Sequence, residues 1–244
     1  MKHSAQLFAF LFVVFQVFTS CIYTNKPVYG NHQLVNNRIS IDNYEQIILN
    51  VPGEVYYQQF SDSTPYLQIH TDENIFEALD VRVQGDQLLI GAKENSNIRP
   101  SKLTIYTCSH NLSKIMISGS GNLHLKGEVN ANELKINITG SGNLIADSLL
   151  CNNLIANITG SGNVKLTGAS NQSSFTVTGS GNIKAFDFLT QELYCKIIGS
   201  GNVEALVFNS LDANIIGSGD LFYRGSPKST NKNITGSGKL HAVN

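Results

Sequence analysis

Tryptophan is absent from the sequence, and charged residues make up only 14% of it. With a formal net charge of -1, the chain lacks the basic surface that binding to nucleic acid or to an anionic membrane surface requires. We therefore expect no nucleic-acid partner. Glycine is abundant, with 21 residues, and Asn, Ser and Thr are frequent. This composition is typical of turn-rich β structure.

Motifs for metals and phosphates are also missing. The six histidines show no ligand spacing, and the cysteines match neither a CxxC motif nor a zinc pattern. Gly236-Ser-Gly-Lys239 is followed by Leu240 rather than Ser or Thr, so it is not a P-loop. Calcium-binding β-rolls need an acidic residue in each nonapeptide repeat, which this chain does not have. We expect no metal and no cofactor.

Three cysteines follow the amino-terminal segment, namely Cys108, Cys151 and Cys195. An odd number cannot all pair within one chain, so buried free thiols are the first prediction. One disulfide among the three is the alternative in an oxidising compartment.

The amino-terminal residues 1–20 have the order of a signal peptide: Lys2, then an apolar run over residues 7–15 that is too short to span a membrane comfortably. Small residues directly before Cys21 resemble the bacterial lipobox, which implies lipid attachment to Cys21 and firm membrane anchoring. Phe18 departs from the aliphatic residue usual there. An ordinary secretory signal with an incidental Cys21 is the alternative.

Lipidation of Cys21 predicts an exported protein of the bacterial cell envelope, with the membrane as a partner through the lipid anchor. We expect an outer membrane lipoprotein on its periplasmic or surface face. Residues 21–37 are polar and without periodicity, so they are predicted to be a tether.

A Gly-Ser-Gly unit recurs seven times after residue 118, at intervals of 18 to 21 residues. Such a period indicates an array of equivalent structural units. The glycines predicted to form the structural turns are Gly119, Gly121, Gly140, Gly142, Gly160, Gly162, Gly179, Gly181, Gly199, Gly201, Gly217, Gly219, Gly236 and Gly238.

Apolar residues stand at fixed distances from each unit, with the parity of a strand. Two places before the first glycine, all seven residues are Ile or Val; four places after it, all are Leu, Ile or Val. The glycines share this inward parity, whereas Ser and Asn face outward, where Asn amides can bond along a stack. The pattern predicts an all-β fold, a β-solenoid (β-helix) with about 20 residues per coil over residues 119–244.

Residues 38–118 lack the Gly-Ser-Gly unit but contain several strand-like runs separated by turn residues. We interpret them as an irregular β region that precedes the solenoid and caps its first coil. A true domain boundary near residue 118 is left open.

The order of these features resembles a Bacteroidetes family described as putative auto-transporter adhesin, head GIN domain. The resemblance covers roughly residues 38–244, and it implies a β-helical cell-envelope protein without established catalytic residues. It lies in the Gly-Ser-Gly-Asn series and in these segments: Asn43-Tyr-Glu-Gln-Ile-Ile48, Gly53-Glu-Val55, Tyr66-Leu-Gln-Ile69, Gln87-Leu-Leu-Ile90, Lys102-Leu-Thr-Ile105 and residues 112–122.

A non-enzymatic role in adhesion, binding or scaffolding fits this pattern best, with a glycan or protein as ligand. The alternative is a carbohydrate-active enzyme, a polysaccharide lyase or hydrolase, because β-helices also carry these. Such a site needs three or more carboxylates or basic groups that converge in one groove. The outward column five places after each first glycine, which includes His124, Lys165 and Glu204, does not predict one. No catalytic residue is assigned.

Two further surfaces are candidates for binding. Outward Asn and Thr before the corners, such as Asn137 and Thr139 or Asn157 and Thr159, form polar ladders that could recognise glycan hydroxyls or ordered water. A plain solvated β face is the simpler interpretation. The chain stops after an inward-phase strand without an evident polar cap, and an uncovered coil end can pair with a second copy in a homo-oligomer.

Overall fold

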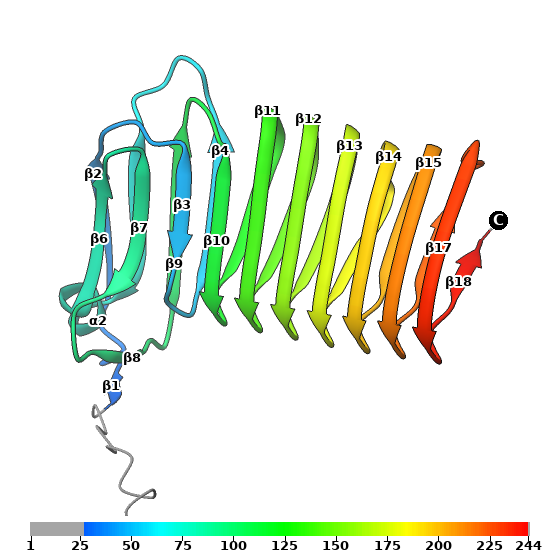
Figure 1. Ribbon diagram of the computed structural model, residues 1–244. Helices are drawn as coiled ribbons and strands as arrows, with labels where there is room; N and C mark the ends of the chain where they lie inside the picture. Colours follow the sequence, from blue (N-terminus) through cyan, green and yellow to red (C-terminus); the bar gives the residue numbers. More distant parts are fainter. Residues whose placement is uncertain (1–26, 244) are drawn as a thin grey trace, which may run out of the picture.

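The computed structural model describes residues 27–243, which form one elongated rod of stacked β coils (Figure 1). Its regular structure is β apart from one short helix, α2 (Glu73–Ala78). The strands of the repeat region are β10 (Lys114–Gly119), β11 (Asn122–Gly140), β12 (Asn143–Gly160), β13 (Asn163–Gly179), β14 (Asn182–Gly199), β15 (Val203–Gly217), β16 (Leu221–Arg224), β17 (Ser229–Gly236) and β18 (Leu240–Ala242).

Neighbouring coils pair in parallel and advance by one sequence repeat. Leu123 pairs with Leu144, and Leu144 pairs with Val164. The predicted β-solenoid and its repeat length are thus confirmed. Within β11 the register shifts between Leu125 and Glu128, where Gly127 has a φ of 73°, so the strand bends and the coil closes on itself.

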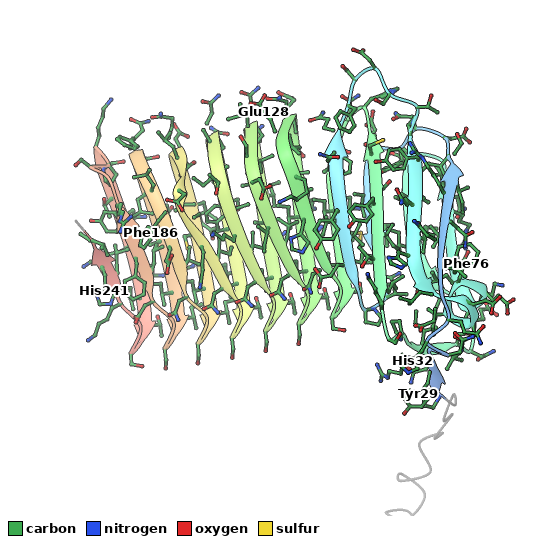
Figure 2. The ribbon with its side chains drawn as sticks, turned by 180° about the vertical axis from the view of Figure 1, so that it is seen from behind. Tyr29, His32, Phe76, Glu128, Phe186 and His241 are labelled. Carbon is green, nitrogen blue, oxygen red and sulfur yellow. The ribbon has the colours of Figure 1, made fainter. Side chains whose placement is uncertain are left out.

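The inward columns of the coils are the core. The column that contains Leu123, Leu144 and Val164 is buried from β11 to β16, and the column that contains Ile136 is buried from β10 to β15. Since full burial of one such side chain stabilises a fold by about 1.5–3 kcal/mol, the stack of columns is the main source of stability. The side chains fill the space between the coil walls in Figure 2.

The two glycines of each corner have different tasks. The first glycine has a positive φ, 120° in Gly160 and 121° in Gly199, which other residues rarely adopt. The second glycine is buried. A Cβ added to Gly181 would collide with the Gly162 carbonyl and lie 2.7 Å from Ile158 Cγ2. Only the second glycine therefore lies against the inward columns, whereas the parity argument placed both there.

The amino-terminal part contains β1 (Pro27–Tyr29), β2 (Leu34–Ser40), β3 (Gln46–Leu49), β4 (Glu54–Gln59), β5 (Tyr66–Asp72), β6 (Leu79–Gln84), β7 (Gln87–Ala92), β8 (Asn97–Arg99) and β9 (Leu103–Ser109). Strand β10 pairs with β11 on one side and with β3 on the other. Strand β4 likewise pairs with β11 and β9, and β7 pairs with β3, all in parallel. Residues 38–118 therefore contribute coils to the solenoid itself, and the sheet is unbroken at residue 118.

The spatial order of these coils differs from their order in the chain. The coil β3–β4 lies between the later coil β7–β9 and the repeat region. Its corner is Val51-Pro52-Gly53, which the register aligns with Gly119-Ser-Gly121. After β9 the chain passes the β3–β4 coil and resumes on its other side at β10.

Antiparallel strands end the rod at its amino-terminal side. Strand β6 pairs antiparallel with β7, and β5 pairs antiparallel with β9 and β2. Strand β1 and the first half of β2 lie within the segment predicted as a tether, so that prediction is wrong for residues 27–29, which pair with β8, and for residues 34–37, which pair with β5. The first residues of the tether, Cys21 among them, and the predicted signal peptide at 1–20 lie outside the described residues.

Asp72 fixes the segment that follows β1. Its carboxylate is buried and accepts hydrogen bonds from the His32 amide at 2.9 Å, the Ser101 amide at 2.8 Å and the Ser101 hydroxyl at 2.6 Å. Burial raises the pKa of Asp72, but the bonds from Ser101 and His32 outweigh it, and the pKa lies below its ordinary value.

At the other end, polar side chains occupy two inward columns of the last coil, whereas Ile234 and Leu240 continue two others. Thr230 and Lys232 pair in register with the buried Leu211 and Ala213. A charged residue in a core column blunts a sheet edge against further strand addition. Thr230 and Lys232 thus make the edge of the last coil partly polar.

We predict that Gly181→Ala destabilises the protein by about 2–3 kcal/mol, because the new Cβ would have to displace the neighbouring coil. The free energy of unfolding in denaturant measures the effect. Ser180→Ala is the matched control, since Ser180 is exposed in the same corner, and it should change stability by less than about 0.5 kcal/mol. Equal stability of both variants would contradict the packing argument.

We also predict a pH-dependent role for Asp72. Its folded-state pKa lies below that of the unfolded chain, about 3.9, so the carboxylate stabilises the fold above that pH, and the stabilisation is lost as the pH falls through the folded pKa. Melting temperatures from neutral to strongly acidic pH should be higher for wild type than for Asp72→Asn at neutral pH and should approach each other in acid. Asp62→Asn, at an exposed position, is the control. A difference independent of pH would refute this assignment.

Candidate functional site

The Gly-Ser-Gly corners carry a ladder of amides along the outside of the rod. The Asn143 amide donates to Asn122 Oδ1 at 2.8 Å, and the Asn163 amide donates to Asn143 Oδ1 at 2.9 Å. The ladder ends on carboxylates, because Asn122 donates to Glu54 at 2.6 Å and Asp220 accepts from the Lys239 backbone amide at 2.7 Å. The predicted bonding of Asn side chains along the stack is confirmed, and these side chains are already engaged with one another.

The outward column after the corner begins with an aromatic stack. The rings of Tyr106 and Tyr56 are 5.2 Å apart, and those of Tyr56 and His124 are 4.7 Å apart. His124 Nε2 lies 2.7 Å from Glu54 Oε2. Burial raises the pKa of Glu54, but the bonds from Asn122 and His124 outweigh it and lower the pKa. Glu54 thus holds the His124 end of the stack, while Tyr106 at its other end is exposed.

The polar ladders before the corners lie outward as predicted. Thr139 and Thr159 are exposed, and the Asn157 amide donates to Asn137 Oδ1 at 3.0 Å. Further along the rod Ile198 and Ile216 interrupt the Thr column. This surface is flat, with nothing that would enclose a ligand.

A groove crosses the coils on the arm that leads into each corner. It has a volume of about 400 Å³ and runs over β11 to β15. One row of its lining is seven places before the first glycine, and the second row is five places before it. The rows contain Glu133, Asn153, Gln172, Glu192 and Ser210, then Ile155, Ser174, Tyr194 and Asp212.

Small residues on β13 create this groove. Ser173 stands in the inward column that Leu154 and Leu193 occupy in the adjacent coils, and Ser174 stands between Ile155 and Tyr194 in the outward column. The Ser173 hydroxyl is buried and lies 2.7 Å from that of Ser170. The surface is therefore lower at β13 than on either side.

Aromatic and polar side chains with free surface line the groove. Tyr194 is 42% exposed. Glu192 accepts hydrogen bonds from the Gln172 amide at 3.1 Å and from the Asn209 amide at 3.4 Å, which fixes its carboxylate. Tyr194 and Asp212 are register partners on adjacent coils, so a carboxylate lies beside the ring.

The groove contains three carboxylates, but they are spread along it. Glu133, Asn153, Gln172 and Glu192 are successive register partners, so three coil spacings, about 14 Å, separate Glu133 from Glu192. Paired carboxylates of glycosidases are about 5–9.5 Å apart. Glu133 therefore lies too far from Glu192 to form such a pair, whereas Glu192 and Asp212 stand on adjacent coils, two register positions apart.

The sequence pattern did not predict this groove. The site residues predicted from the sequence were Cys21, which lies outside the described residues, and the corner glycines, which shape the backbone and carry no ligand group. The available signal was Ser173, which interrupts the column formed by Leu134, Leu154, Leu193 and Leu211. Its effect depends on the neighbouring coils, which the pattern of one repeat does not specify.

In the part of the chain that the structure describes, the cysteines, the metal-ligating residue types and the helical structure add no further site. Cys108, Cys151 and Cys195 are free thiols, with Cys108 and Cys195 buried and Cys151 partly buried; burial raises the pKa of Cys151 to about 11. Between residues 27 and 243 no group of three or more His, Cys, Asp or Glu side chains could hold a metal ion. None of the helical structure in that range is long and apolar enough to cross a membrane.

The model of a family described as "Putative auto-transporter adhesin, head GIN domain" matches residues 43–227. Among solved structures, a "putative lipid binding protein" from Parabacteroides distasonis is 34% identical with a TM-score of 0.77, over 90% of this chain and 100% of that one. A "putative adhesin" from Bacteroides fragilis is 26% identical with a TM-score of 0.84, over 88% and 100% of the two chains.

A "putative adhesin" from Parabacteroides merdae is 27% identical with a TM-score of 0.74, and the match covers 89% of this chain and 99% of that one. No curated protein matches the chain.

Proposed function

The chain belongs to the family described as "Putative auto-transporter adhesin, head GIN domain", and we propose that it is a non-enzymatic binding module of the bacterial cell envelope. In this proposal a lipid on Cys21 holds it at the outer membrane. Its ligand is a glycan or a protein, and its work is adhesion or scaffolding. The relatives described as adhesins or as a binding protein support the non-enzymatic binding role.

The shape of the rod carries this proposal. The described chain begins at β1, beside β8 and at the end opposite β18 (Figure 1), and Tyr29 and His32 lie far from His241 in Figure 2. A lipid on Cys21 would therefore hold the amino-terminal end near the membrane, while the repeat coils and their groove extend away from it. Such a layout suits the presentation of a binding surface.

The sequence before the fold supports the anchor. The apolar run of residues 7–15 is followed by small residues and Cys21, the order in which lipoprotein signals place their modified cysteine. Two or three acyl chains bind a membrane stably, whereas one chain does so only marginally. Asp72 then fixes the loop after β1 to the body, so the solenoid cannot swing freely on that segment.

The description of one relative as lipid binding has less support from the geometry of this chain. A lipid tail needs an apolar cavity, and the inward columns are filled by packed side chains that are almost fully buried. The groove over β11 to β15 is open and combines polar side chains with apolar ones such as Ile155 and Leu193. Hydroxyl-rich or peptide ligands suit these surfaces better.

We predict that the full chain, expressed in a bacterial host with labelled palmitate, takes up the label and sediments with membranes, whereas Cys21→Ala does not. Cys151→Ser is the matched control and should label like wild type. Equal labelling of wild type and Cys21→Ala would rule out the anchor. Label in neither variant, with the protein secreted in soluble form, would point to the ordinary secretory signal.

A further inference from the structure

We propose that the groove over β11 to β15 binds an unbranched glycan without anionic groups, which lies along the axis of the rod. This inference rests on the binding role proposed above and assigns it a site and a ligand class. Its volume of about 400 Å³ is within the range of ligand sites in proteins, about 300–1,000 Å³.

The direction of the ligand follows from the register of the coils. Each coil contributes one polar side chain to the first row of the groove, from Glu133 on β11 to Ser210 on β15, so polar groups recur there at every coil spacing, about 4.8 Å. Along the first row these groups are a carboxylate, two amides and a second carboxylate, from Glu133 to Glu192. A linear polymer with one hydroxylated ring per unit meets an equivalent polar group at each step.

The chemistry of the lining selects hydroxyl and amino groups. Carboxylates accept hydrogen bonds from hydroxyls and ammonium groups, and side-chain amides both donate and accept. The exposed Tyr194 ring offers an apolar face and a polar tip to a sugar ring. No Lys or Arg lines the groove, whereas Glu133, Glu192 and Asp212 repel anions. A polyanionic glycan is therefore disfavoured.

A glycan suits the groove better than a peptide does. Extended peptides bind by adding a strand to an unpaired sheet edge. The groove lies over β11 to β15, and each of these strands is paired with a coil on both sides. No backbone groups of the groove wall are free for strand addition, so recognition has to use side chains.

Titration calorimetry on the full chain in detergent tests this assignment with cellohexaose and with the hexamer of glucosamine. We expect binding of at least one of them, and none of oligogalacturonate. Ser174→Tyr fills the low point of the groove and Tyr194→Ala removes the ring, so each should weaken binding by about tenfold or more. Thr176→Tyr is the matched control, because Thr176 lies two residues further on the same face of β13 and outside the groove; it should bind like wild type.

The outcomes separate the site from the general function. Glycan binding that is equal in all variants would place the ligand elsewhere and overturn the groove, while the binding role stands. Binding of oligogalacturonate in preference would overturn the ligand class. If wild type captures a defined protein or peptide and binds neither hexasaccharide, the glycan assignment is also overturned. New reducing ends released from the bound hexasaccharide would overturn the non-enzymatic proposal itself. Thermal melts of each variant show that folding is unchanged.

Discussion

The close approach of successive coils at the Gly-Ser-Gly corners is the constraint on which the structure depends. The carbonyl of Gly140 accepts hydrogen bonds from both Ser161 and Gly162 of the next coil, at 2.8 and 3.0 Å. At this close approach neither glycine has room for a Cβ: on Gly160 it would collide with the Gly140 carbonyl, and on Gly162 with the Gly142 carbonyl. Because equivalent hydrogen bonds join each corner to the next, equivalent residues of successive coils lie above one another in every column. The buried core, the amide ladder and the rows of the groove all follow from that alignment.

Periodicity was sufficient to predict the repeat region, because parity assigns each residue to the inside or the outside of a coil. The inward columns and the outward Asn ladder were found where the pattern placed them. The amino-terminal coils were not predicted, since the corner Val51-Pro52-Gly53 lacks the repeated unit and its partners β7 and β9 come later in the chain. Strand β2 was not predicted as part of the fold, because its pairing with β5 is non-local and leaves no periodic signal.

The groove of the candidate site could not be predicted from the repeat pattern, for a related reason. A groove is a difference between coils, whereas a repeat motif records what coils share. Ser173 and Ser174 matter because Leu154, Leu193, Ile155 and Tyr194 stand above and below them. The two ends of the rod illustrate the same point: antiparallel strands close one end, and Lys232 interrupts a core column at the other. Both are departures from the repeat, and both protect exposed strand edges.

The interleaved order of the first coils has a consequence for biogenesis. When β3 and β4 leave the export channel, neither of their partners has yet emerged, and the coil cannot be completed until β7, β9 and β10 arrive. Long-range pairing of this kind makes the amino-terminal module the slow step of folding. Every later coil finds a finished template and needs only local contacts with its predecessor. Whole repeats could therefore be added to or removed from the far end of the rod without a change in the contacts of the interleaved first coils.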